Sequence, residues 1–188
     1  MMNVMDILLG GQNSQAVKEL ARHFGIGEDQ AQDAIKHLAP AVSRGLQREM
    51  SDEDRRAQLI RALQGGDHAK YIDRPEILGR PETADDGNGI LGHIFGSKEV
   101  SRAVASEASA RTGLASGIMK KMLPVVATMV MGSLGKTVLS GALGGGDAAS
   151  AASSSTGGLM DVLSGFLDTD HDGSVVDDLL GMAGKMFR

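Results

Sequence analysis

The chain has 188 residues, 41% of them hydrophobic, which is enough apolar material for the core of one medium helical domain. Only 3% of the residues are aromatic and none is Trp, so the core must consist of aliphatic side chains, Met and Ala. Because the net charge is −5 and acidic residues lie in several places, we expect no basic field of the kind that attracts nucleic acid or anionic lipid. The absence of Cys excludes disulfides and thiolate metal sites, and it is consistent with a reducing cytosol.

The first third of the chain shows helical periodicity. A short apolar run at 1–10 contains Asp6 and has no basic residue before it, which indicates a first helix of the fold and not a signal peptide. Apolar residues then recur at helical spacing from 17 to 24 and from 31 to 42, on either side of Gly25-Ile26-Gly27. We expect two amphipathic helices there, the second kinked or restarted at Pro40.

A further helix is expected to begin near residue 51. Ser51 is the expected N-cap, and Asp54 occupies the capping-box position, where Glu or Gln is usual. Its buried face would carry Leu59, Ile60 and Leu63.

Residues 65–89 collect a Gly-Gly step, two Arg-Pro steps and Asp-Asp-Gly, so we expect a loop between two helical halves. Residues 90–96 predict a small helix, and Ser97 is expected to cap the next one. Val100, Val104 and Ala108 would line that helix up to Gly113.

The most apolar stretch follows, at 114–131. The longest uncharged run, 122–135, is interrupted by Pro124 and falls short of the ~18 apolar residues of a membrane span, so we expect the stretch to form a buried helix. Its four Met suit either an irregular core or a promiscuous interface, and we favour the core. Residues 21–42 and 109–126 also resemble each other, each with Gly before and Pro within the helix, which suggests a duplicated helical unit.

Composition divides the chain after residue 143. Residues 144–158 are almost entirely Gly, Ala and Ser, which is typical of a tether. The sequence thus predicts a helical domain at 1–143 and a C-terminal piece at 159–188. In that piece, apolar helical patterns at 159–167 and 179–187 flank an acidic run, giving a helix, an acidic loop and a second helix.

The acidic run predicts a divalent-cation loop. Hard cations such as Ca²⁺ prefer oxygen ligands, and an EF-hand loop supplies them at positions one, three, five and, through its backbone carbonyl, seven, with Gly at six. Asp168, Asp170, Asp172, Gly173 and Ser174 occupy these positions. Five carboxylates lie within the eleven residues 168–178 without any Lys or Arg, so they repel one another unless a cation joins them or some protonate.

The loop departs from the EF-hand pattern at its twelfth position, which holds Leu179 in place of a bidentate Glu. The candidates for closing it are Asp177 and Asp178. The run is similar to shorter Asp-x-Asp-x-Asp-Gly loops of extracellular bacterial proteins, which close with an acid at the tenth position. That resemblance implies Asp177 as closing ligand, with Asp178 beside the ion or as a charge at the helix N-terminus. We expect a weak site for Ca²⁺ with limited discrimination against Mg²⁺.

A simpler interpretation makes Asp172-Gly173 a turn and Asp177 the cap of the last helix. It accounts for two of the five acids, and we favour the metal loop for that reason.

No pattern predicts catalysis. The five His are dispersed at 23, 37, 68, 93 and 171, without His-Glu-x-x-His spacing. Gly135-Lys136-Thr137 resembles the end of a phosphate-binding loop, but Val130 stands where that loop needs Gly. We therefore expect neither an enzyme nor an organic cofactor.

Several segments resemble the YidB-like family of bacterial proteins of unknown function. The most specific is residues 89–96, Gly-Ile-Leu-Gly-His-Ile-Phe-Gly, and the others are the opening Met-Asp-Ile-Leu-Leu-Gly, the Met-Leu-Pro helix at 122–124 and the tail 172–181. The resemblance implies an all-α domain with homeodomain-like helical units, and no established activity.

Taken together, the sequence predicts an all-α multi-helix bundle with homeodomain-like units and a C-terminal helix-loop-helix whose acidic loop is EF-hand-like. We expect a cytoplasmic, non-enzymatic interaction protein that binds Ca²⁺, or Mg²⁺, and associates with a protein partner or with itself. One alternative is a helix-turn-helix DNA-binding protein, opposed by the acidic residues at 28–33. Another is a membrane-surface protein using 114–143, opposed by the scarcity of Lys and Arg there. We expect neither nucleic acid nor a membrane as partner.

Overall fold

The computed structural model describes residues 8–10 and 14–143, and within those ranges the secondary structure is entirely helical. The elements, in chain order, are α2 (Ser14–Phe24), α3 (Glu28–Ser51), α4 (Glu53–Gly65), α5 (Lys70–Asp73), the 3-10 turn η2 (Pro75–Ile77), α6 (Pro81–Phe95), α7 (Lys98–Thr112) and α8 (Ser116–Leu143). The all-α prediction is confirmed for this part of the chain. The predicted tether at 144–158 and the helix-loop-helix at 159–188 lie outside it.

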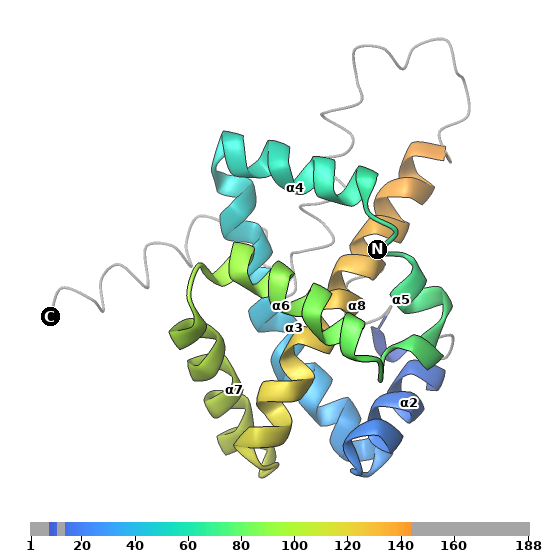
Figure 1. Ribbon diagram of the computed structural model, residues 1–188, viewed down its shortest axis with the longest axis vertical. Helices are drawn as coiled ribbons and strands as arrows, with labels where there is room; N and C mark the ends of the chain where they lie inside the picture. The colour runs from blue at the N-terminus through green and yellow to red at the C-terminus, as the bar shows by residue number, and fades with distance from the viewer. Residues whose placement is uncertain (1–7, 11–13, 144–188) are drawn as a thin grey trace, which may run out of the picture.

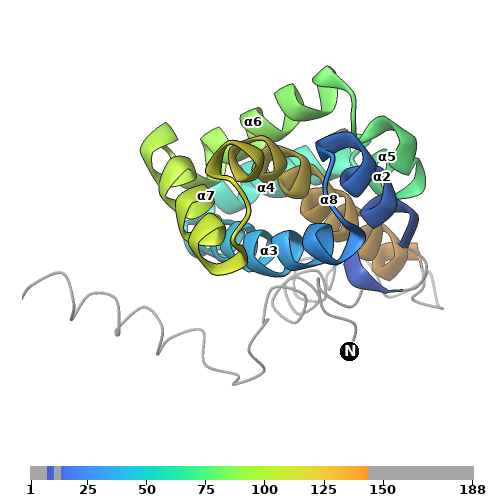
Figure 2. The same ribbon diagram turned by 90° about the horizontal axis from the view of Figure 1, so that it is seen from below.

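Helix α8 is the centre of the domain (Figures 1 and 2). It packs most extensively against α6, α7 and α3, and it also contacts α2, α4 and α5. Every residue from Met122 to Leu134 is buried, so no side of this stretch faces solvent. A helix that is apolar all round must be covered all round, which explains why the other helices surround α8.

The methionines of α8 are core residues, as predicted. Met119, Met122 and Met129 are fully buried and Met131 is nearly so. Residues 116–137 are long and apolar enough to cross a membrane, but this part of α8 is mostly buried inside the domain. The burial is that of a core helix.

Helices α2 and α3 form where the apolar spacing predicts them. Gly25, with φ 65°, ends α2, and the amide of Ile26 donates to the carbonyl of Ala21 across the turn. The side chain of Gln30 accepts a hydrogen bond from the backbone amide of Gly27 at the start of α3. Pro40 lies inside α3, and the helix continues through it to Ser51 without restarting.

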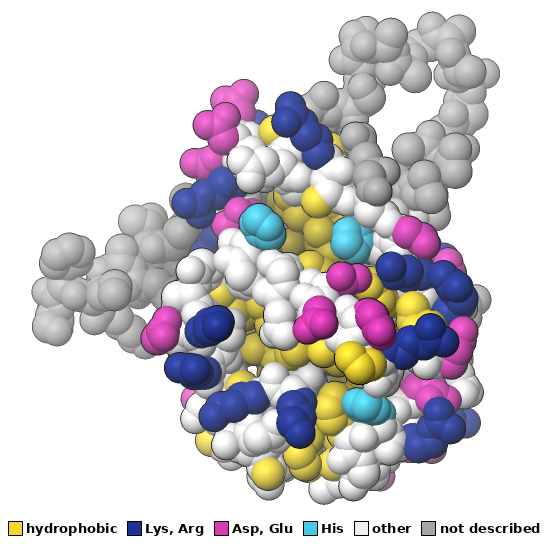
Figure 3. Space-filling view, viewed as in Figure 1, with side chains coloured by type: hydrophobic (Ala, Val, Ile, Leu, Met, Phe, Trp, Pro, Cys, Tyr) yellow, Lys and Arg dark blue, Asp and Glu magenta, His cyan; other side chains and the backbone are white. Residues whose placement is uncertain are grey.

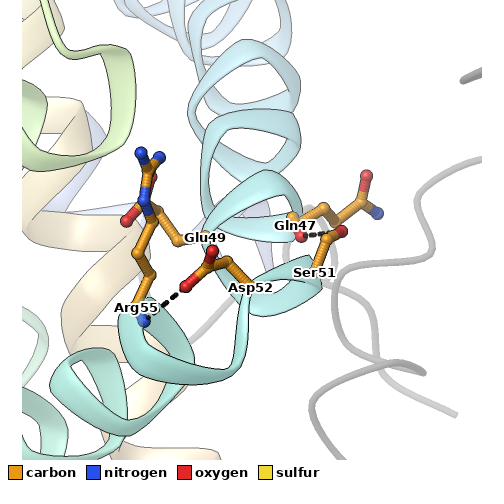
Figure 4. Close-up of polar contacts among 5 residues, drawn as sticks. All are labelled: Gln47, Glu49, Ser51, Asp52 and Arg55. Atoms are coloured by element: carbon orange, nitrogen blue, oxygen red, sulfur yellow. Dashed lines mark hydrogen bonds and ion pairs between the residues drawn. The ribbon is translucent and has the colours of Figure 1, made fainter.

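The junction of α3 and α4 differs from the predicted capping box (Figure 4). Ser51 is the last residue of α3, and its hydroxyl donates to the carbonyl of Gln47 over 3.2 Å. The N-cap of α4 is Asp52, whose carboxylate accepts from the amide of Arg55 at 3.0 Å. An ion pair of 3.2 Å between Arg55 and Glu49 then ties α4 back to α3.

The predicted capping box is therefore wrong by one residue. An Asp at the N-cap places a full negative charge at the positive end of the helix dipole, which a Ser hydroxyl does not. Along α4, Leu59 and Leu63 are buried as expected, and Ile60 is partly exposed.

The prediction of a loop over 65–89 is wrong for much of its length. Helix α5 and turn η2 lie within it, and α6 already begins at Pro81, so the small helix expected at 90–96 is the second half of α6. Gly87 explains why a turn-like sequence is helical: a Cβ there would lie 2.0 Å from the carbonyl oxygen of Pro124. Glycine lets the backbone of α6 touch α8, and this packing outweighs the poor helix propensity of the local sequence.

Ser97 caps α7 as predicted, accepting a hydrogen bond from the amide of Val100 at 3.3 Å. The face of α7 that packs on the core is rotated from the expected one. Ala105 and Ala108 are buried, whereas the side chain of Val100 is 39% exposed. Gly113, with φ 73°, ends the helix and leads into α8.

Candidate functional site

The predicted metal ligands Asp168, Asp170, Asp172, Ser174, Asp177 and Asp178 all lie outside the residues that the structure describes. Their role as metal ligands therefore stays a prediction. Within residues 8–10 and 14–143, no three His, Asp or Glu side chains stand close enough together to hold a metal ion.

A group of polar side chains joins α5 and the turn before it to α6 and α8, and we call it the α5 polar cluster. Its members are His68, Tyr71, Asp73, Asp86 and Lys136. Tyr71 is only 2% exposed, and its hydroxyl donates to the carboxylate of Asp86 on α6. The ammonium of Lys136 on α8 lies 2.7 Å from a carboxylate oxygen of Asp73. The cluster thus links α5 to two other helices.

The electrostatics of the cluster keep its two titratable rings neutral at physiological pH. Burial raises the pKa of the Tyr71 hydroxyl, and the hydrogen bond to Asp86 and the negative charge of that residue raise it further. Burial lowers the pKa of His68, an effect that the nearby carboxylate of Asp86 opposes in part. A protonated Tyr and a neutral His can donate and accept hydrogen bonds, but neither is an activated nucleophile.

Backbone contacts fix the position of the cluster. A Cβ at Gly132 of α8 would lie 2.6 Å from the carbonyl oxygen of His68, so the backbone of α8 touches the turn just before α5. Asp86 directly precedes Gly87, whose backbone touches α8 at Pro124. The polar groups therefore lie where three helices meet at close range, and the arrangement acts as a structural link.

Sequence reasoning missed this cluster because it treated 65–89 as a loop. Two signals were present. Tyr71 is the single Tyr of the chain, and the buried residues of α6 recur at helical spacing, namely Thr83, Gly87, Leu91 and Ile94. Glycine and threonine are weak markers of an apolar face, so the period was hidden.

The helix-turn-helix alternative concerns α2 and α3. These helices are joined by a tight turn, but α3 packs against α2, α4, α6, α7 and α8. The residues that open α3, Glu28 and Asp29, are exposed and acidic, and they would repel phosphate. This surface has the wrong charge for a recognition helix.

A family model described as a bacterial protein of unknown function (DUF937) matches residues 6–137. The match runs from the predicted first helix through most of α8. It stops before the Gly, Ala and Ser segment and the acidic loop. Neither a curated protein nor a solved structure matches the chain.

Proposed function

Because the chain belongs to the DUF937 family of bacterial proteins of unknown function, we propose a role from its own residues: a non-enzymatic interaction protein whose C-terminal loop binds a divalent cation. The observation that carries the proposal is the alternation of Asp residues that closes on Gly173. Hard cations select oxygen-only ligand sets of this kind, and a turn alone would not require five acids in eleven residues.

The proposed ligands are the carboxylates of Asp168, Asp170 and Asp172, the backbone carbonyl of Ser174, and Asp177 as the closing carboxylate. Asp178 adds negative charge beside the ion. Since Leu179 stands where a bidentate Glu would close an EF-hand, the site has one closing oxygen donor fewer and should bind Ca²⁺ weakly, with Mg²⁺ as competitor.

The extent of the family match supports separate roles for the helical domain and for the C-terminal segment. It covers 6–137 and ends before the acidic loop, although the tail 172–181 shares in the resemblance to the YidB-like family. We propose that the helical domain is the scaffold for a protein partner or a second copy, in the cytoplasm, and that the C-terminal segment senses the cation. The homeodomain-like likeness concerns the fold only and supports no DNA-binding role.

Calorimetric titration of the full chain with Ca²⁺ tests the proposal. We expect one ion per chain with a dissociation constant on the order of 10⁻⁴ to 10⁻³ M, the range of weak Ca²⁺ loops. Asp170→Ala should abolish the binding heat because it removes a central ligand. Asp147→Ala removes the same charge from the same C-terminal segment outside the loop, and it should bind Ca²⁺ as the parent does.

Equal titrations for the two variants, or no binding to the parent at millimolar Ca²⁺, would refute the cation site. A parallel titration with Mg²⁺ measures selectivity. Circular dichroism of each variant checks that the helical domain is intact, so that a lost signal reports on the loop.

A further inference from the structure

One surface of the domain is distinctly basic, and we call it the basic face. It consists of the exposed Lys and Arg residues of α7 and of the first turns of α8, which are Lys98, Arg102, Arg111, Lys120 and Lys121. Figure 3 shows Lys and Arg side chains gathered over α7 and over the adjoining end of α8. The acidic residues of these two segments are limited to Glu99 and Glu107.

The acids of α7 leave much of this positive charge unbalanced. Arg111 makes a good ion pair with Glu107, at 2.8 Å, while Arg102 and Glu99 are 3.9 Å apart and both are mostly exposed. Lys120 and Lys121 form no ion pair with any residue that the structure describes. Five Lys and Arg residues stand against two Glu residues, so the face keeps an excess of positive charge.

The charges of the whole chain are distributed in a complementary way. Residues 97–143 hold six Lys and Arg against two acids, an excess of four positive charges. Residues 144–188 hold seven Asp against Lys185 and Arg188, an excess equal to the whole net charge of −5. The basic face therefore belongs to the segment that directly precedes the most acidic part of the chain.

We propose that the basic face binds the acidic loop, residues 168–178, of its own chain. The five carboxylates of the loop need positive charge nearby, and in the absence of a cation the Lys and Arg residues of α7 and α8 supply it. The occupant is thus a peptide segment with closely spaced carboxylates and no basic residue. Tethering to the domain raises its effective concentration well above that of a free acidic peptide.

The length of chain allows this contact. From Lys121 to Leu143, α8 rises about 33 Å at 1.5 Å per residue. The 24 residues between Leu143 and Asp168 can span up to about 80 Å when extended. The loop can therefore return to the basic face even though the chain leaves α8 at the opposite end.

Cation binding would then compete with docking, and this part of the inference rests on the proposed function. A divalent cation cancels two of the charges of the loop and turns its carboxylates inward, so it weakens the attraction to Lys and Arg. By thermodynamic reciprocity, docking must lower the affinity for the cation by the same factor. A docked fraction of about two-thirds would raise the apparent dissociation constant for Ca²⁺ about threefold.

Paramagnetic NMR on the full chain tests the docking. The protein has no Cys, so Ser164→Cys provides a unique attachment point for a nitroxide label next to the acidic loop. In cation-free buffer at low salt, we expect selective broadening of the amides of α7 and of residues 116–123. The broadening should decline at 1 M salt, where the Debye length falls to about 3 Å.

Charge reversal supplies the decisive comparison. Lys120→Glu with Lys121→Glu should remove the selective broadening. Lys18→Glu with Lys36→Glu makes the same change of charge at exposed sites on α2 and α3, and it should leave the broadening in place. Broadening that is uniform over the domain, or equal in the two double variants, would overturn the proposal.

Two further readouts separate the possible failures. Protein that carries the nitroxide at natural isotope abundance, mixed with ¹⁵N-enriched protein without the nitroxide, should cause no broadening. Broadening in this mixture would mean that the basic face binds the loop of a second copy, and it would refute docking within one chain. Addition of Ca²⁺ should release the loop. If calorimetry detects no Ca²⁺ binding while the cation-free chain still shows selective broadening, the cation site is refuted and the docking is supported. If Ca²⁺ binds but the cation-free chain shows no selective broadening, the docking is refuted and the cation site is supported.

Discussion

Two segments of this domain have the same local construction but different surroundings. In each, a shorter helix ends at a glycine with positive φ, Gly25 or Gly113, and leads into a long helix that contains a proline, Pro40 or Pro124. Helix α3 keeps an exposed polar side along its length, whereas α8 is buried on all sides from 122 to 134. The shared construction is what the idea of a duplicated helical unit predicts, and the duplication itself stays a prediction.

The difference shows how side-chain pattern decides the place of a helix in a fold. Helix α3 alternates buried Ala, Ile and Leu with exposed residues such as Lys36 and His37, so neighbours cover one side only. Helix α8 offers no polar stripe in its middle, and the fold must enclose it. The two prolines follow the same rule: Pro40 is partly exposed, while Pro124 is buried and its carbonyl meets the backbone of α6.

The strongest test of this contrast places a charge in the middle of each helix. Thr128 of α8 is fully buried and its hydroxyl donates to the carbonyl of Val125. Thr128→Lys should lower the free energy of unfolding by about 4 kcal/mol, because it buries an unpaired charge. His37→Lys on the exposed side of α3 should change it by less than about 0.5 kcal/mol.

Urea unfolding followed by circular dichroism measures both values. If Thr128→Lys lowered the free energy of unfolding as little as His37→Lys does, α8 would have a solvent-accessible side. That result would contradict the enclosure of α8 by the other helices.

The contact between α6 and α8 provides the next test. Gly87→Ala should cost about 3 kcal/mol, because the new Cβ would lie 2.0 Å from the carbonyl oxygen of Pro124 and the backbones would have to separate. Gly92→Ala, in the same helix, meets no atom within 4 Å and should raise the free energy of unfolding by about 0.5–1 kcal/mol through better helix propensity. The opposite signs are the expected result of chemical denaturation, and equal effects would contradict the close approach of the two helices.

These contacts also show how far the sequence alone predicts the fold. The helical spacing of aliphatic residues predicts α2, α3 and α8, and Ser97 predicts the start of α7. These predictions succeed because each depends only on residues close together in the sequence. Helix α6 was missed because Asp85-Asp86-Gly87 has the composition of a turn, and only a partner 37 residues away, Pro124, makes Gly87 suitable for a helix. The α5 polar cluster was missed for the same reason, since its members meet only after α5, α6 and α8 have packed.

A smaller effect is expected from the α5 polar cluster. Tyr71→Phe removes the hydroxyl that donates to Asp86 and should lower the free energy of unfolding by about 1 kcal/mol. Asp86 is exposed and recovers water as a partner, which limits the cost. Tyr71→Ala should cost several-fold more, because the buried ring is lost as well. A Phe variant as unstable as the Ala variant would mean that the hydrogen bond, and not the packing of the ring, dominates.

The smallest expected effect is a pH dependence from His68. Burial lowers its pKa in the folded state below the value of 6.5, so the unfolded chain takes up a proton more readily. Stability contributed by the neutral ring is therefore present above pH 6.5 and declines as the pH falls below that value. His68→Gln should flatten this part of the pH profile, measured as urea midpoints between about pH 7.5 and 5.5. An unchanged profile would place the titration on other residues.

The most direct test of cation binding is a Ca²⁺ titration of the ¹⁵N-labelled full chain followed amide by amide. We expect progressive, saturable shifts of the amides of residues 168–178, with smaller changes on α7 and the first turns of α8 as the loop leaves the basic face. Amides in the enclosed part of α8, from 122 to 134, should not move. Resonances of 168–178 that stay unchanged at millimolar Ca²⁺ would contradict the proposed cation site.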